Sequence, residues 1–249
     1  MKLNSDKWYI KRPDLLEYHY SDDVFNVIIT DLLKGKKHFS LNRFGEGELR
    51  LLSGRRHEGE FKSINNEWFI EEKTDQWFVD KLKDAMLYEN PTYIKAFNTH
   101  QQNNRDYYLS IDQFKNNKTF FTASFYEWVG KNQVNLYSSI IDLFKQYDGI
   151  NLICSKLANI KNIKINFNNC WNEFKTFNSW KQTEYMDKVV QKISKMNNNI
   201  FLFVTGFSTK LMIKELHTLN PNNVYIDMGS ALNGKIYNDR RRNIAKKGL

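Results

Sequence analysis

The sequence contains few of the residues that interrupt or cross-link a chain. It has only 3 prolines and 11 glycines in 249 residues, which leaves little room for long flexible linkers. Its two cysteines, Cys154 and Cys170, are too few for a disulfide scaffold, and their spacing matches no zinc pattern. No run of about 18 apolar residues is present, so we expect no membrane-spanning helix. The first residues also lack the apolar stretch of a signal peptide, and a reducing, cytoplasmic setting is expected.

Several common catalytic and nucleotide-binding signatures are missing as well. The sequence has no Gly-x-Gly-x-x-Gly dinucleotide fingerprint, no Walker loop and no nucleophile elbow. Its five histidines show no metal-ligand spacing, and neither cysteine lies in a recognisable catalytic setting. The candidates for chemistry are therefore acidic and glycine-containing segments.

The overall composition indicates a folded, basic protein. Hydrophobic residues make up 41% of the chain and aromatic residues 15%, which is typical of a globular core. We expect a single domain over residues 1–249, with its core at about 20–230. The net charge of +9 favours nucleic acid, anionic membranes or phosphorylated small molecules as partners. Residues 231–249 form a basic tail, for which peripheral membrane contact is a hypothesis.

Helical and strand patterns alternate along the chain. Helical periodicity and end signals predict helices at 21–34, 71–89, 134–147, 183–196 and 208–219. Apolar runs predict strands near 38–41, 120–121, 150–154, 163–165, 200–204 and 224–226. The last strand–helix–strand succession is a βαβ unit, which implies a parallel sheet. The expected fold class is therefore α/β, with a Rossmann-like, mostly parallel sheet flanked by helices.

Residues 43–48, Arg-Phe-Gly-Glu-Gly-Glu, form the most distinctive segment. Its glycines are expected to form a hinged turn that lets a ligand approach the backbone. Glu46 and Glu48 can converge on one divalent cation, and Arg43 can hold phosphate in a bidentate fork. The pattern therefore indicates a metal–diphosphate site. The alternative is a solvated loop whose glutamates start a helix, because acidic side chains favour helix N-termini.

Polar residues also follow other predicted strands, and ligands of open parallel sheets bind beyond the carboxyl ends of strands. Ser155 follows one such strand. Thr205, Gly206 and Ser208 lie where a helix N-terminus attracts phosphate, with Ser208 as the expected cap; capping alone is the alternative. Asp227 ends the last strand and is a candidate for sugar contact or for a base, or alternatively caps the next turn.

Two separated motifs resemble the bacterial GT-D type glycosyltransferases, once a domain of unknown function. Residues 40–49, Ser-Leu-Asn-Arg-Phe-Gly-Glu-Gly-Glu-Leu, are similar to the family's Arg-Phe-Gly-Asp-Gly-Glu segment with its Asp-x-Glu motif. Residues 203–210 and 225–230 resemble its closing strand–Gly–helix–strand with an Ile-Asp-Ile-Gly end. Weaker similarity covers residues 153–156 and 168–171. Glu46 stands where the family usually has Asp, which keeps the charge but lengthens the side chain by one methylene.

The resemblance implies a GT-D-like fold and transfer of a sugar from a nucleotide diphosphate, typically a UDP-sugar, to a hydroxyl of a glycan or glycoconjugate. It implies Mn2+ or Mg2+ as cofactor, with Glu46 and Glu48 as the metal motif. The catalytic candidates are Glu48, Glu46 and Asp227. The candidates for binding the donor are Arg43, Gly45, Gly47, Ser155, Thr205, Gly206 and Ser208. A cation and an arginine that neutralise the leaving diphosphate would lower the barrier.

Two other functions stay open. A basic nucleic-acid-binding module would lose affinity steeply with salt. Because the aromatics are spaced like core residues and no recognition motif is present, we expect no nucleic-acid partner. A non-catalytic nucleotide-sugar binder would hold the donor without turning it over. The sequence does not determine the donor sugar, the acceptor, the stereochemical outcome or the oligomeric state.

Overall fold

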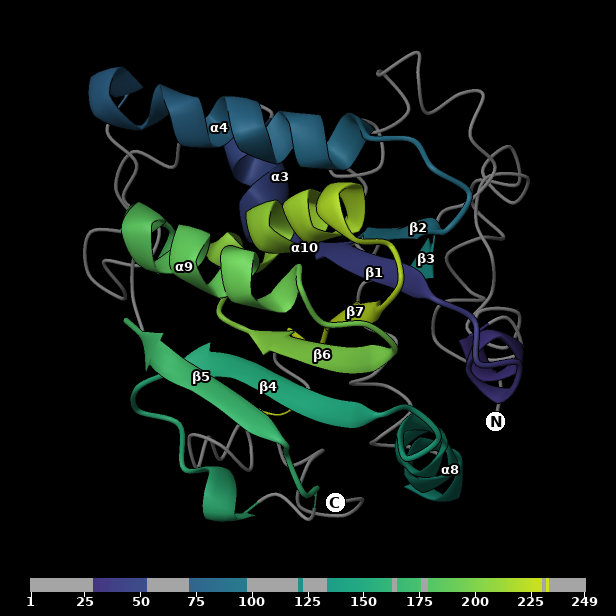
Figure 1. Ribbon diagram of the computed structural model, residues 1–249. Coiled ribbons are helices and arrows are strands. Elements are labelled where there is room, and N and C mark those ends of the chain that lie inside the picture. The colour runs from purple at the N-terminus through teal and green to yellow at the C-terminus, as the bar shows by residue number, and fades with distance from the viewer. Residues whose placement is uncertain are drawn as a thin grey trace.

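The computed structural model describes residues 29–52, 72–97, 121–122, 134–162, 165–175, 179–229 and 232. Within this part of the chain, seven strands form one sheet in the order β3-β2-β1-β7-β6-β4-β5 (Figure 1). Every strand pairing is parallel. The prediction of an α/β fold built on a Rossmann-like parallel sheet is confirmed.

Each predicted helix and most predicted strands have a described counterpart, whereas the strands at 93–97 and 169–174 are not predicted. The strands are β1 (Phe39–Phe44), β2 (Tyr93–Phe97), β3 (Phe121–Thr122), β4 (Gly149–Ser155), β5 (Asn169–Phe174), β6 (Asn199–Val204) and β7 (Val224–Asp227). The helices are α3 (Glu46–Leu52), α4 (Glu72–Leu87), α8 (Val134–Phe144), α9 (Thr183–Ile193) and α10 (Phe207–Leu219), with short 3-10 turns η3 (Ile160–Asn162) and η4 (Ser179–Lys181). Residues 29–34 are also helical, as the prediction for 21–34 requires.

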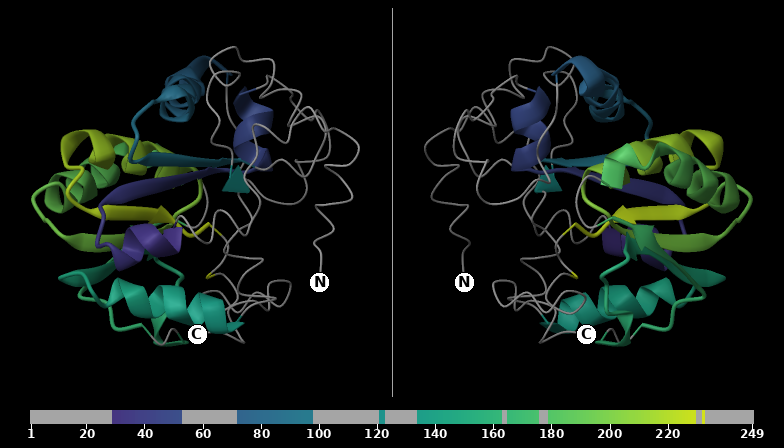
Figure 2. Two further views of the ribbon diagram at one scale, coloured as in Figure 1. Left: turned by 90° about the vertical axis from the view of Figure 1, so that its right-hand side faces the viewer. Right: turned by 90° about the vertical axis from the view of Figure 1, so that its left-hand side faces the viewer.

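The sheet separates two layers of apolar side chains. Residues 29–34 and α8 cover one face, while α4, α9 and α10 cover the other (Figure 2). Along β6, Ile200 and Leu202 join the first layer, whereas Phe201 and Phe203 join the second. Successive side chains of a strand point to opposite faces, so a strand covered on both faces forms a continuous apolar run. This double burial explains the pattern that predicts β6.

The strand predicted at 163–165 is described only in part: residues 163–164 lie outside the described residues, and Ile165 lies outside the described strands. Among the described strands, the one that follows β4 is β5, at Asn169–Phe174. β5 is an edge strand that pairs only with β4, and most of its side chains are exposed or half-buried. Because one side of β5 faces solvent, its sequence is polar and lacks the apolar run by which a strand is predicted.

The unit β6–α10–β7 brings distant parts of the chain together. β7 pairs with β6 on one side and with β1 on the other, with Leu41 beside Ile226. Since the strands are parallel, the carboxyl ends of β1, β7, β6 and β4 lie along one edge of the sheet, where ligands of such folds bind.

The described helices set limits on two other expectations. None of them is both long and apolar enough to cross a bilayer. The tail at 231–249, apart from Leu232, lies outside the described residues, as does the first part of the helix predicted at 21–34. The single domain and the role of the tail stay predictions.

Candidate functional site

The distinctive segment is a strand end followed almost at once by a helix. A single residue, Gly45, separates β1 from α3, and Gly47 lies inside α3. The predicted glycine-hinged turn is wrong, because the described glycines with positive φ are Gly206 and Gly229. Gly45 is instead closely packed, since an added Cβ would lie 3.0 Å from Oε2 of Glu48 and would require that side chain to shift.

Glu48 closes the start of α3. Its Oε2 accepts the backbone N–H of Gly45 at 2.8 Å, as the third residue of a helix does in a capping box. The alternative interpretation of residues 43–48 is a solvated loop whose glutamates start a helix. Its second part is confirmed for Glu48, which caps the start of α3. Its first part is wrong, because Glu48 is buried. The side chain of Glu46 lies outside the described part of the structure, and its roles stay predictions.

Helix α10 places Lys210 between two acidic side chains from distant parts of the chain. Its Nζ lies 2.6 Å from Oδ2 of Asp227 and 3.2 Å from Oε1 of Glu48. All three side chains are at most 7% exposed. Burial alone lowers the pKa of Lys210, but Asp227 and Glu48 outweigh it, so the pKa is raised above its ordinary value. Lys210 is therefore a protonated ammonium that holds α10, α3 and β7 together.

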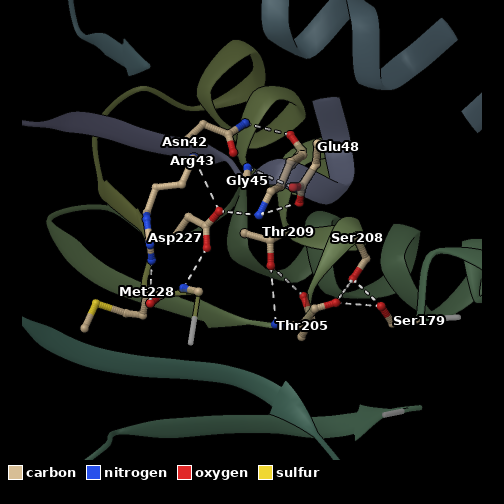
Figure 3. A network of polar contacts seen from close by, with 12 residues as sticks. Asn42, Arg43, Gly45, Glu48, Ser179, Thr205, Ser208, Thr209, Asp227 and Met228 are labelled. Atoms are coloured by element: carbon tan, nitrogen blue, oxygen red, sulfur yellow. Dashed lines mark hydrogen bonds and ion pairs between the residues drawn. The ribbon is translucent and has the colours of Figure 1, made fainter. Parts of the chain in front are cut away.

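Asp227 ends β7 and holds the turn behind it. Its Oδ1 accepts the N–H of Gly229 at 2.8 Å, and its Oδ2 accepts the N–H of Arg43 at 3.3 Å (Figure 3). The alternative interpretation, in which Asp227 caps the following turn, describes the first contact. The roles of sugar contact or base stay predictions.

Arg43 organises the same turn. Its Nη1 donates to the carbonyl oxygen of Met228 at 2.8 Å, and a Cβ built on Gly229 would overlap the guanidinium group. Its Nε is buried and has no hydrogen-bond partner in the described structure. These contacts are those of a turn organiser, and the predicted grip on a diphosphate is untested.

Asn42 is buried in the same cluster, and the sequence does not single it out as a site residue. Its Nδ2 donates to the hydroxyl of Tyr93 at 2.6 Å and to the backbone carbonyl of Lys210 at 2.9 Å. Asn42 therefore fixes the first turn of α10 to β1. Figure 3 shows Asn42, Arg43, Glu48 and Asp227 gathered where β1 and β7 end.

The turn between β6 and α10 has a different form from the predicted one. Gly206 is the N-cap of α10, with φ of 64°, ψ of −130° and no side-chain capping bond, so the expected cap by Ser208 is wrong. Ser208 Oγ instead donates to the carbonyl of Thr205 at 2.9 Å and meets the hydroxyl of Ser179 at 3.0 Å. Thr205 N–H donates to Oγ1 of Thr209 at 3.3 Å. These hydroxyls brace the turn from inside.

Gly206 itself is exposed. Among the described residues, no atom lies within 4 Å of an added Cβ. A ligand can therefore reach the backbone at the N-terminus of α10, where helix N–H groups favour an anion. Ser155 ends β4 at the same edge of the sheet, on the far side of β6 from β7.

The described side chains do not fit a divalent cation. Each of the four carboxylate oxygens of Glu48 and Asp227 already faces a donor at 3.2 Å or less. No group of three or more His, Cys, Asp or Glu able to hold a metal occurs among the described residues. Metal binding by Glu46 and Glu48 therefore stays a prediction that the described contacts do not support.

Lys210 is the main residue that sequence reasoning missed. It stands on the same helical face as Ile213 and His217, which are both buried. A lysine on the apolar face of a helix needs a buried partner, and this was the available signal. The partners themselves come from α3 and β7, and only the fold brings them within reach.

Comparison with known proteins gives a match in fold. No family model and no curated protein matches the sequence. The selenomethionine-substituted structure of domain of unknown function 1792 matches with a TM-score of 0.56 and 15% identity, over 83% of this chain and 77% of that chain. A second structure, titled "The highly conserved domain of unknown function 1792 has a distinct glycosyltransferase fold", matches with a TM-score of 0.51 and 14% identity, over 82% of this chain and 76% of that one.

At 14–15% identity, the similarity establishes the fold and leaves the activity to be argued from the site. The predicted resemblance is confirmed at that level. The chain has the fold of domain of unknown function 1792, which is described as a distinct glycosyltransferase fold.

Proposed function

We propose that this protein transfers a sugar from a nucleotide diphosphate, a UDP-sugar, to a hydroxyl group of a glycan or glycoconjugate. The observation that carries the proposal is the buried cluster of Arg43, Glu48, Lys210 and Asp227 at the carboxyl edge of a sheet with a glycosyltransferase fold. Ligands of open parallel sheets bind at this edge.

The turn at Gly206 is the proposed site for the donor diphosphate. Its positive φ and open surroundings leave the N-terminus of α10 accessible, and α10 has 13 residues whose dipoles align toward that end. When the bond to the sugar breaks, negative charge grows on the diphosphate. Positive charge already fixed in place stabilises that change without reorganisation.

The cluster of charged side chains has a positioning role in this proposal. Lys210 ties the start of α10 to Glu48 and Asp227, and Asn42 ties it to β1. The start of α10, where we propose that the donor binds, is therefore attached to three other elements: α3, β7 and β1. Asp227 stays the candidate for contact with the sugar or for the base.

A non-catalytic nucleotide-sugar binder is the second candidate. The observation that favours it is that the carboxylates of Glu48 and Asp227 are both paired: each of their oxygens already faces a donor. Such a protein would bind the donor as tightly as an enzyme but would release no UDP.

Thermal unfolding of the full chain with UDP, GDP and their sugar conjugates tests the proposal. A ligand at 100 times its Kd stabilises the native state by about 2.7 kcal/mol, which raises the melting temperature measurably. We expect UDP or a UDP-sugar to raise it and the same sugar donor to release UDP over time. Stabilisation without UDP release would support the non-catalytic binder, and stabilisation by oligonucleotides alone would contradict both candidates.

Gly206→Ala is the variant that locates the donor. A Cβ at this positive φ would strain the turn and project into the open space above it, so we expect nucleotide affinity to fall about tenfold, or about 1.4 kcal/mol. Gly35→Ala is the control, because Gly35 precedes β1 at the opposite edge of the sheet and has no positive φ. Equal nucleotide affinity in both variants would exclude the Gly206 turn.

A further inference from the structure

We propose that the ammonium group of Lys210 is the permanent counter-cation of Glu48 and Asp227, so that no divalent metal binds between these two carboxylates. The inference rests on the proposed function for what the site binds. Its claim about the cation rests on the geometry of the cluster alone.

The position of Lys210 is fixed at both ends. Its Nζ lies between the carboxylates, 2.6 Å from Oδ2 of Asp227 and 3.2 Å from Oε1 of Glu48. Its backbone carbonyl accepts a bond from Asn42 at 2.9 Å. The side chain is buried and starts from the first turn of α10, so it cannot swing away without moving the helix.

Every oxygen of the two carboxylates already accepts a hydrogen bond or forms an ion pair. Glu48 uses Oε2 for the N–H of Gly45, and Asp227 uses Oδ1 for the N–H of Gly229. Their remaining oxygens both face Lys210. A metal that bridges the two side chains at about 2.1 Å would have to displace the ammonium, because Oε1 of Glu48 and Oδ2 of Asp227 both face it.

The charges of the cluster already balance. Arg43 and Lys210 carry two positive charges, and Glu48 and Asp227 carry two negative charges. A divalent cation would add positive charge to a buried, neutral group and would leave the Lys210 ammonium without its partners. Stranding a buried charge is strongly unfavourable, so the internal lysine excludes the metal.

Mn2+ binding to the full chain, measured by electron paramagnetic resonance and by thermal unfolding, tests this inference. We expect Mn2+ neither to bind the wild-type cluster nor to raise its melting temperature. Stoichiometric Mn2+ binding that Glu48→Gln removes would overturn the inference.

Lys210→Met tests the same inference from the opposite direction. Methionine keeps much of the length but removes the charge, which leaves two carboxylates facing each other. We expect this variant to gain Mn2+-dependent stabilisation and to lose it again when Glu48→Gln is added. Lys214→Met is the matched control: Lys214 lies one turn further along α10 and pairs with Asp84 at 2.7 Å, so no Mn2+ response should appear.

The outcomes separate this inference from the proposed function. No gain of Mn2+ response in folded Lys210→Met would contradict the inference. If Lys210→Met does not fold, Mn2+ titration of the wild type and of Glu48→Gln still decides. If no nucleotide stabilises the wild type with or without Mn2+, the proposed function fails, whereas Mn2+ titration of the wild type and of Lys210→Met still decides the cation.

Discussion

Gly229 is a single residue on which the shape of the site depends. It has φ of 50°, and the guanidinium of Arg43 fills the space where a Cβ would stand. Gly206 also has a positive φ, but open space surrounds it. Substituting Gly206 should therefore show the effect of backbone strain alone, whereas substituting Gly229 should add the displacement of Arg43.

We expect Gly229→Ala to lower the free energy of unfolding by roughly 2–4 kcal/mol, from left-handed strain and a displaced Arg43. Gly206→Ala should cost only about 1–2 kcal/mol, because strain alone applies there. Denaturant unfolding of both variants gives the comparison. Equal losses would mean that the contact between Gly229 and Arg43 contributes nothing.

His217 makes stability depend on pH. Its Nδ1 lies 2.7 Å from Oγ of Ser40, and burial lowers the pKa of His217 from 6.5 to about 4. Between these values the unfolded chain binds a proton that the folded chain does not. Stability from His217 is therefore complete above pH 6.5 and is lost as the pH falls toward 4, by up to roughly 3 kcal/mol.

Unfolding free energies from pH 4 to 7 in the wild type and in His217→Gln measure this contribution. We expect the variant to be less stable at pH 7 but to lose less stability on acidification. The same pH dependence in both proteins would show that another group is responsible.

At the scale of elements, a ladder of asparagines ties the strands together near their amino ends. Asn169 Nδ2 donates to Oδ1 of Asn151 at 2.8 Å, and Asn151 Nδ2 donates to Oδ1 of Asn199 at 3.1 Å. Asn223 Oδ1 accepts the backbone N–H of Asn199 at 3.0 Å. The ladder thus crosses β5, β4, β6 and the start of β7.

We expect Asn151→Ala to destabilise the protein by roughly 2–3 kcal/mol, because it leaves the buried Asn199 amide oxygen without this donor. Asn169→Ala should cost less than about 1 kcal/mol, since Asn169 is exposed at the end of the ladder. Urea unfolding of the two variants distinguishes a continuous ladder from independent bonds. Equal costs would contradict the ladder.

Elements buried on both faces were predictable, and elements defined by partners were not. β6 is apolar from Ile200 to Val204, and this run predicts the strand almost residue for residue, whereas β5 is polar at the edge of the sheet and its pattern predicts no strand. The start of α3 is predicted as a turn because glycine adopts backbone conformations closed to other residues. The structure instead begins the helix there, and Glu48 accepts the backbone N–H of Gly45 three residues before it.

At the scale of the whole molecule, the order of the strands creates the site. β1 and β7 are adjacent although nearly the whole described chain separates them, and their carboxyl ends bring Arg43 beside Asp227. The order of the two motifs predicted this fold, and two solved structures of domain of unknown function 1792 confirm it. The motifs did not reveal Lys210 as the link, because its partners on α3 and β7 come within reach only in the folded chain.

UDP release from UDP-sugars by the full chain, followed over time in EDTA, tests the central claim most directly. We expect the wild type and Lys214→Met to release UDP from one donor, and Lys210→Met to be slower by roughly 100-fold, because a shift of the donor site by about 1 Å can cost that much. No release from any donor by the wild type, or equal rates in wild type and Lys210→Met, would contradict it.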